Sequence, residues 1–224
     1  MKINLLRFDV NYGSAKRSKL NRIPSRGFYD TETVNKIIDK ALYCHVSFVQ
    51  DDQPFVIPAI HARAGNNLII HGAKSSRMIK QIAAGNKLCV AITILDGLVL
   101  ARSAFHHSMN YRSVVLFGKG KEIKIKQEKI AAFKAITDHL LPGRWEDARQ
   151  PNEEELNASA VVSISIDEAS AKIRSGPPKD DEEDYKLPVW AGVIPVSRVF
   201  DLPVNDPELG KDIRVPGYIL DHLK

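Results

Sequence analysis

The stretch CHVSFVQDDQPFVIPAIHARAGNNLIIHG, Cys44 to Gly72, decides the fold class. Three apolar runs rich in β-branched and aromatic residues are separated by the short polar segments QDDQ and GNN. Such runs, bounded by turn-forming residues, are typical of β-strands joined by tight turns. We therefore predict strands over Cys44–Val49, Pro54–Ala62 and Leu68–Gly72.

The same pattern of short runs and turns continues towards the C-terminus. Asp96-Gly97 is a hairpin-type dipeptide between two apolar runs, so we predict a turn there. The further strands that we expect are Lys87–Leu95, Leu98–Arg102, Tyr111–Phe117 with its continuation Gly118–Ile125, Ala160–Ile166 and Leu187–Val196. Ser103–Asn110 reads as a polar loop.

Helical periodicity is confined to a few segments. Apolar residues recur with helical spacing from Val34 to Leu42, and Asp30 before them is suited to cap the helix. Other helices are expected at Ser75–Ala84, Gln127–Leu141 and Asn152–Ala158. Many short strands with few helices favour a mainly β fold with flanking helices, closed or nearly closed into a barrel. We predict one domain over 1–224, with a basic N-terminal arm (1–26) and a C-terminal tail (197–224).

Composition places the chain among ordinary globular proteins. Hydrophobic residues make up 44% and charged residues 26% of the sequence. No apolar run approaches the ~20 residues of a membrane span, and no leader pattern opens the chain, so we expect a cytoplasmic protein. Cys44 and Cys89 lie in apolar runs without a CxxC motif, which predicts two buried free thiols.

The net charge of +5 is unevenly distributed. Basic residues crowd the first segment, and an acidic run spans Asp180–Asp184. The basic residues of the arm are Lys2, Arg7, Lys16, Arg17, Lys19, Arg22 and Arg26. Both features are typical of solvated surface. The arm lacks the interleaved aromatic residues of a single-strand binder, which argues against a nucleic-acid partner.

The segment IIHGAKSSRM, Ile69–Met78, has the pattern of an anion-binding corner. A strand ends at His71-Gly72 and a helix is expected to begin near Ser75, where unpaired backbone N–H groups attract anions. Lys74 and Arg77 add positive charge beside them. The alternative is a serine helix cap with two solvated cations. Neither GxGxxG nor GxxxxGK[ST] occurs, so no dinucleotide-binding fold or P-loop is indicated.

Three further sequence segments are informative together with this corner. They are PFVIPAI, LDGLVLARSAFHHSMNYRSVVLFGKG and KLPVWAGVIPV. Through these four segments, over roughly Arg26 to Pro195, the chain resembles the pyridoxamine-5′-phosphate-oxidase-like FMN-binding proteins. Its nearest branch is the flavin-nucleotide-binding family related to nitroimidazole reductases. The resemblance implies a split β-barrel homodimer with FMN at the subunit interface.

The resemblance also implies which residues hold the cofactor. The FMN phosphate would be bound by His71, Gly72, Lys74, Ser75, Ser76 and Arg77. The flavin ring and ribityl chain would be contacted by Val56, Ile57, Pro58, Arg112, Ser113 and Trp190. The chain departs from true oxidases after WAGVIPV, because SRVFDLPVNDP keeps Arg198 but lacks their substrate-binding Arg-x-His arrangement. We therefore do not expect vitamin B6 oxidation.

His106 and His107 are the remaining reactive residues. Neighbours on a strand point to opposite faces, and a transition-metal site needs three or four ligands, so no metal site is predicted. Either histidine could donate a proton to substrate beside the flavin. The alternative is that one of them hydrogen-bonds the backbone and orders the loop before Tyr111.

Three functions stay open at this point. The first is an FMN-dependent oxidoreductase acting on a small molecule, with a nicotinamide as possible electron donor. The second is a non-catalytic flavin-nucleotide or haem-type binding module for storage or sensing. The third is an interaction protein that uses its basic arm.

Overall fold

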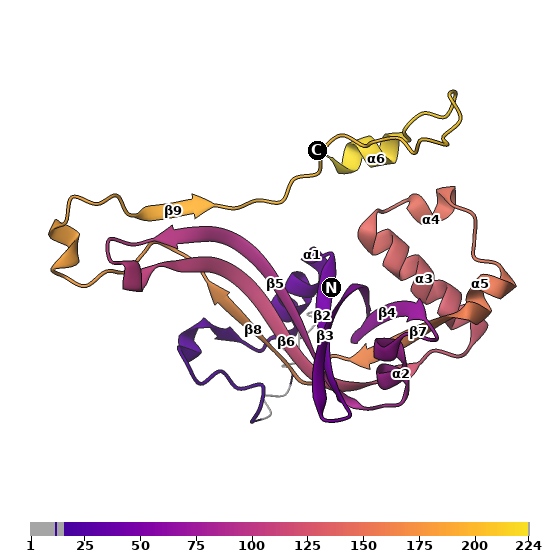
Figure 1. Cartoon of the computed structure of the whole chain (residues 1–224), viewed down its shortest axis with the longest axis horizontal. Coiled ribbons are helices and arrows are strands. Elements are labelled where there is room, and N and C mark those ends of the chain that lie inside the picture. The colour runs from indigo at the N-terminus through magenta and orange to yellow at the C-terminus, as the bar shows by residue number, and fades with distance from the viewer. Residues whose placement is uncertain (1–11, 13–15, 224) are drawn as a thin grey trace, which may run out of the picture.

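The computed structural model describes residue 12 and residues 16–223. Residues 1–11, 13–15 and 224 lie outside the described part, and with them Lys2 and Arg7 of the predicted basic arm. Figure 1 shows a barrel with helices around it, a long strand arm that projects from it, and a C-terminal segment that returns along the arm.

In the described part of the chain, nine strands form one antiparallel sheet in the order β1-β8-β6-β7-β4-β3-β2-β5-β9. The strands are β1 Gly27–Phe28, β2 Tyr43–Gln50, β3 Gln53–Ala64, β4 Asn67–Ala73, β5 Lys87–Leu100, β6 Ser108–Glu122, β7 Ser159–Ser165, β8 Ala169–Arg174 and β9 Gly192–Pro195. A further pairing between β6 and β5 closes the ring β6-β7-β4-β3-β2-β5. The predicted mainly β fold with a closed barrel is therefore confirmed.

The first hairpin shows how the sequence sets the barrel. Cys44, Val46 and Phe48 of β2 are buried, and the residues between them face outward. This alternation is the period of a half-buried strand. Asp51 and Asp52 both have positive φ values, 52° and 56°, as a two-residue turn between twisted strands requires. The predicted QDDQ turn is confirmed.

Most helices flank the barrel, whereas the last one, at the end of the tail, lies apart from it (Figure 1). The helices are α1 Thr31–Lys40, α2 Arg77–Ala83, α3 Lys126–Leu140, α4 Arg144–Asp147, α5 Glu153–Ala158 and α6 Gly217–His222, with 3-10 turns η1 Pro24–Arg26, η2 Ala104–His106 and η3 Asp184–Lys186. The predicted cap of α1 is confirmed, because the Asp30 carboxylate accepts a 2.8 Å hydrogen bond from the Thr33 N–H. The elements β1, β8, α4 and α6 were not predicted from the sequence.

The hairpin predicted at Asp96-Gly97 is wrong. β5 runs unbroken from Lys87 to Leu100, with a β-bulge between Leu95 and Gly97. Residues 98–100 continue the same strand and pair with β9. A Cβ on Gly97 would lie 3.0 Å from the Ile194 carbonyl oxygen, so this glycine permits close packing of β9 and makes no turn.

The cysteines are both free. Cys44 is buried as predicted, and burial raises the pKa of its thiol to about 12, which makes it unreactive. Cys89 is only half-buried, so the prediction that both thiols are buried is wrong for Cys89. No helix in the described ranges is both long and apolar enough to cross a bilayer.

Candidate functional site

The outward-facing side of β2 and β3 carries an exposed apolar surface. Tyr43, Val49, Val56, Pro58 and Ile60 lie on it, and we call these residues the outer face. Val56 is 64% and Tyr43 is 55% exposed. Contiguous apolar side chains left in water usually mark a binding or subunit surface. Of the predicted flavin-ring contacts, Val56 and Pro58 therefore lie together here, whereas Ile57 packs inward against the core.

The predicted phosphate corner lies between β4 and α2. Ser75 and Arg77 line a cavity of about 360 Å³ together with Gln50, Lys80 and Gln81. No carboxylate belongs to this lining among the described residues, so two cations give the cavity a charge of +2. The chemistry suits an anion such as a phosphate group.

Two neighbouring contacts position this corner. The Arg77 guanidinium lies 4.3 Å from the centre of the Phe55 ring, a cation–π contact that links α2 to β3. Ser76 precedes the helix and makes no side-chain capping bond. A Cβ on Gly72 would lie 3.0 Å from Ile79 Cγ1, so the glycine lets α2 approach β4.

His71 and Lys74 are not brought to this cavity. The His71 ring packs 5.4 Å from the Phe133 ring of α3, and desolvation beside this ring lowers the pKa of the imidazole although the residue is still exposed. Lys74 lines a separate cavity of about 310 Å³ with Glu122 and Lys126. The sequence segment therefore divides between two sides of the fold, which its linear pattern did not reveal.

Arg112 and Ser113 lie on β6, away from the corner. Arg112 is bound by Asp96 on β5, and this hydrogen-bonded contact raises the pKa of the guanidinium. The Ser113 hydroxyl donates to the Lys172 carbonyl oxygen over 3.3 Å. Arg112 therefore links β5 to β6, whether or not it also contacts a ligand.

Arg112 also lines a further cavity, of about 410 Å³. Its walls come from the end of α1, the start of β2, the middle of β5 and the beginning of the tail. They are Lys40, Ala41, Leu42, Tyr43, Thr93, Ile94, Leu95, Asp96, Arg112, Val196, Ser197 and Arg198. We call it the tail cavity. Lys40 and Tyr43 were not predicted as site residues, because no sequence pattern places the tail beside α1.

Trp190 lies beside the strand arm, by which we mean the projecting parts of β5 and β6 with β9 paired to them (Figure 1). It is 66% exposed and lies over Gly192, where an added Cβ would be 2.8 Å from the indole. Gly192 pairs with Leu100, so this tryptophan stands far along the arm, whereas α2 flanks the barrel (Figure 1). Within one chain, Trp190 and the phosphate corner are not brought together.

The tip of the arm is held by Asp180. Its carboxylate accepts hydrogen bonds from the backbone N–H groups of Arg102 (2.8 Å) and Ser103 (3.1 Å) and pairs with the Arg102 guanidinium. Desolvation opposes ionisation, yet these hydrogen bonds outweigh it and lower the pKa of Asp180. The acidic run is therefore anchored on the arm.

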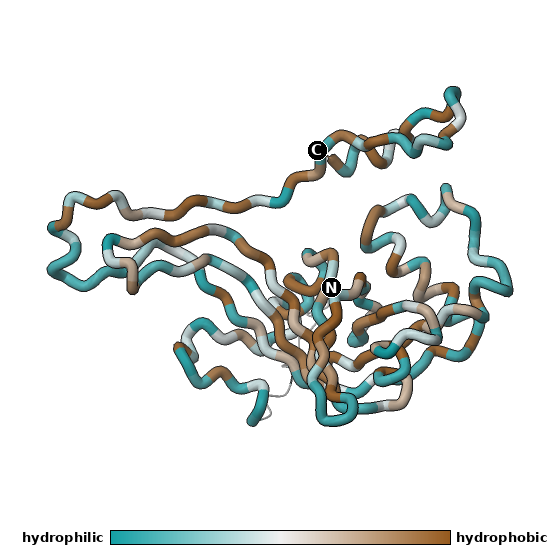
Figure 2. The backbone as a smooth tube through the Cα atoms, in the orientation of Figure 1, coloured by the Kyte–Doolittle hydropathy of each residue, from teal (hydrophilic) through white to brown (hydrophobic). Residues whose placement is uncertain are grey.

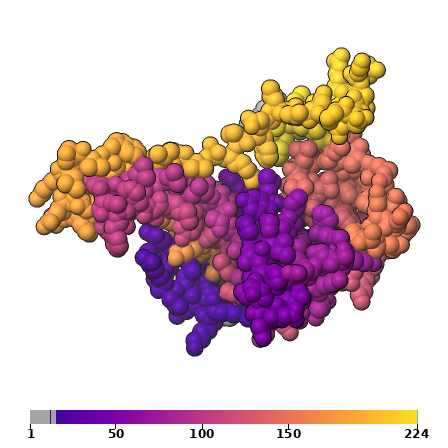
Figure 3. Space-filling model, viewed as in Figure 1, coloured from indigo at the N-terminus to yellow at the C-terminus, as the bar shows by residue number. Residues whose placement is uncertain are grey.

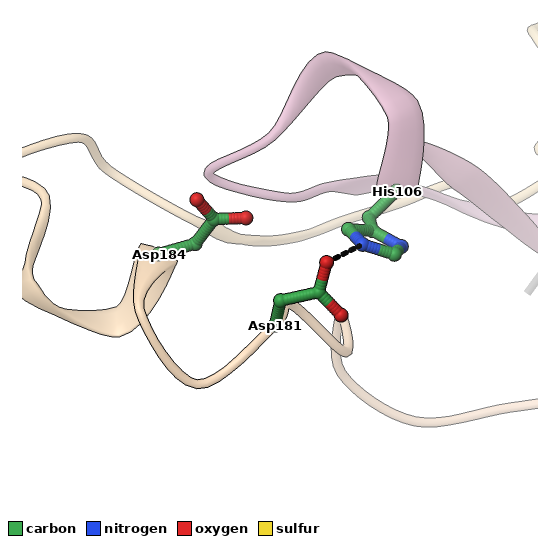
Figure 4. A group of neighbouring side chains, drawn as sticks. All are labelled: His106, Asp181 and Asp184. Carbon is green, nitrogen blue, oxygen red and sulfur yellow. Dashed lines mark hydrogen bonds and ion pairs between the residues drawn. The ribbon is translucent and has the colours of Figure 1, made fainter.

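This anchor brings two carboxylates to His106. His106 Nε2 lies 3.3 Å from Asp181 Oδ2, and Asp184 completes a group whose ligand atoms lie within 4.8 Å of one another (Figure 4). The Asp181 side chain is 83% exposed, as in a surface ion pair. This contact was not predicted from the sequence, because it joins residues 75 positions apart.

His107 has a backbone partner. Its Nδ1 accepts a hydrogen bond from the Ala101 N–H over 3.2 Å, which places the ring proton on Nε2. This contact supports the alternative in which a histidine orders the loop. A proton-donating role for His106 or His107 stays a prediction.

Comparisons with known proteins place the chain in a family. The sequence model described as Pyridoxamine 5′-phosphate oxidase matches residues 30–173. No curated protein matches the chain.

Two solved structures are similar over most of their lengths. The flavocytochrome Anf3 from Azotobacter vinelandii is 39% identical, with a TM-score of 0.87, over 92% of this chain and 96% of that one. The FAD and heme binding protein from Mycobacterium smegmatis is 31% identical, with a TM-score of 0.84, over 88% and 96%. The barrel is therefore the split barrel of this family. The chain belongs to the pyridoxamine 5′-phosphate oxidase-like family of flavin-binding proteins.

Proposed function

We propose that this protein is a redox protein that binds FAD and haem and works as a homodimer. The observation that carries the proposal is the similarity, along nearly the whole chain, to a flavocytochrome and to a protein that binds FAD and haem. The resemblance in the sequence favoured FMN. We prefer FAD because the second of these relatives binds it.

The residues of the phosphate corner fit a flavin nucleotide. Arg77 and Lys80 supply positive charge and Ser75 a hydroxyl group, which together suit a phosphate or a pyrophosphate. The contact of Arg77 with Phe55 places this charge beside the strand that carries Val56 and Pro58. The corner would therefore hold the phosphate while the outer face packs against the isoalloxazine ring.

When bound, the flavin would supply hydride and single-electron chemistry, and the haem single-electron chemistry. The protein contributes binding, orientation and exclusion of water. Val56 and Pro58 would shield one side of the ring. The substrate and the electron donor, with a nicotinamide as the first candidate, belong to the same proposal.

A second copy of the chain would cover the surfaces that one copy leaves exposed. The outer face is apolar, and the tail carries exposed apolar residues such as Val199, Leu202 and Val204, the last 95% exposed. Figure 2 shows these apolar segments along the tail, and Figure 3 shows the arm and tail standing out from the barrel. In a dimer the arm would bring Trp190 towards the partner's flavin.

The absorption spectrum of the purified chain tests the proposal. We expect flavin bands and a haem Soret band, with FAD released on denaturation and a dimeric mass in solution. FMN in place of FAD would revise the cofactor alone. If no flavin binds even after FAD and FMN are added, the proposal is wrong.

Anaerobic addition of NADH or NADPH separates an enzyme from a binding module. Bleaching of the flavin bands supports the oxidoreductase. A bound flavin that neither nicotinamide reduces would favour a storage or sensing module instead.

A further inference from the structure

We propose that the tail cavity binds the carboxylate-bearing edge of the haem, with Lys40, Arg112 and Arg198 as partners of the two propionates. The inference rests on the proposed function, since it names the place of the haem within the fold. It is carried by the charge, the walls and the position of this cavity.

The charge of the cavity matches a dicarboxylate. Three cations and one carboxylate, that of Asp96, line it, which leaves a charge of +2. Lys40 makes no ion pair with the described residues and is exposed. Arg198 Nη2 donates a hydrogen bond to the Lys40 carbonyl oxygen over 3.3 Å, and this contact ties the tail to the end of α1 beside the cavity.

Arg112 keeps one donor group for a ligand. Its Nε and Nη2 bind the two oxygens of Asp96, and Nη1 has no hydrogen bond to the described residues. Asp96 therefore holds the guanidinium in a fixed orientation and neutralises only one of the three cations. Such preorganised cations favour a carboxylate partner.

The walls of the cavity are suited to an apolar ring. Ile94, Leu95 and Val196 line it, and its volume of about 410 Å³ lies within the range of small-molecule sites. The phenol of Tyr43 borders it, and the His45 ring lies 5.6 Å from the Tyr43 ring on the same outward side of β2. Tyrosine and histidine are both known ligands of haem iron.

The tail cavity is distinct from the phosphate corner. Tyr43 borders the tail cavity and Gln50 borders the corner, and these are the two ends of β2. They are seven residue steps apart along the strand, or about 23 Å. The outer face lies between the two sites, so one strand would carry both cofactors.

The test compares haem with its dimethyl ester, in which both propionates are neutral. The full chain, freed of haem, is titrated with each compound while Soret absorbance is followed. The variants are Lys40→Ala and Arg198→Ala. Arg214→Ala, an exposed cation of the same tail, is the matched control.

We expect each variant to weaken haem binding about tenfold or more, through loss of a charge-assisted contact. Binding of the ester should stay within twofold of the unsubstituted chain, and Arg214→Ala should change neither. Equal effects on haem and ester, or none on haem, would overturn the inference.

Failure of the inference can be told from failure of the proposed function. If the unsubstituted chain binds haem and the variants bind it equally well, only the proposed location of the haem is wrong. A chain that binds no haem overturns the haem part of the proposed function, and the site with it. Lys40 and Arg198 are both exposed, so neither change removes core packing.

Discussion

Arg112 and Asp96 form a two-bond ion pair across the β5–β6 ladder, with Nε–Oδ2 at 2.8 Å and Nη2–Oδ1 at 2.6 Å. Asp96 stands at the β-bulge of β5, and its carbonyl oxygen accepts the Val196 N–H at 3.1 Å. One residue therefore joins the two arm strands to the start of the tail.

We expect Asp96→Asn to lower the free energy of unfolding by about 1 kcal/mol or less, because both side chains are partly solvated. Urea denaturation measures this change. Lys36→Ala, which removes an exposed pair with Glu32, is the control and should cost less. A loss above about 3 kcal/mol would show that the pair is effectively buried.

The double change Ser76→Ala, Arg77→Ala should weaken flavin binding. Each charge-assisted hydrogen bond to phosphate contributes about 1.5–3 kcal/mol, so we expect a loss of at least tenfold. Ser76 makes no capping bond, and among the described residues Arg77 gives up only its contact with Phe55, so the fold should persist. Quenching of flavin fluorescence on titration measures the affinity.

Lys87→Ala, an exposed change on β5, is the control for that double change. It should leave the affinity as it is. If the double variant binds flavin as tightly as the unsubstituted chain, the phosphate lies elsewhere.

The parts of the fold that could be predicted are those set by local sequence. The Asp51-Asp52 turn and the Asp30 cap depend on residues within four positions of one another, and both were found. The closed barrel followed from strand spacing. Gly97 was misread because its role is contact with β9, nearly a hundred residues later in the chain.

The candidate site was only partly predictable for the same reason. The pattern around Ser75 and Arg77 is contiguous, and the structure keeps these residues together. The tail cavity joins α1, β5 and the tail, and the partner of His106 is Asp181. No pattern within a short stretch of sequence predicts such long-range contacts, because they depend on how the closed sheet brings distant segments together.

Gly120→Ala should destabilise the barrel. The added methyl group would overlap the Ile82 side chain of α2 and lie 3.3 Å from the Ser163 carbonyl oxygen. Overpacking of a buried site costs about 1–3 kcal/mol. Thermal unfolding measures the loss. Gly217→Ala is the matched control, because no atom of the described residues lies within 4 Å of its new Cβ, and the stability of this variant should change little.

His61 should make the protein less stable in mild acid. Its ring is fully buried, and Nε2 donates to the Ile38 carbonyl oxygen of α1 at 3.0 Å. Burial lowers the pKa of this imidazole from 6.5 to about 4, although the bond to Ile38 opposes the shift. Between these two pH values the unfolded chain binds a proton that the folded chain does not. The contribution of His61 to the free energy of unfolding is therefore fully present above pH 6.5 and is lost as the pH drops towards 4.

A pKa shift of this size corresponds to about 3 kcal/mol over that window. His61→Gln removes the titration, so the free energy of unfolding, measured in urea from pH 7 to pH 4, should fall less steeply than in the unsubstituted chain. His222→Gln, at an exposed position on α6, is the control and should retain the original slope. The same slope in His61→Gln would mean that other groups cause the acid sensitivity.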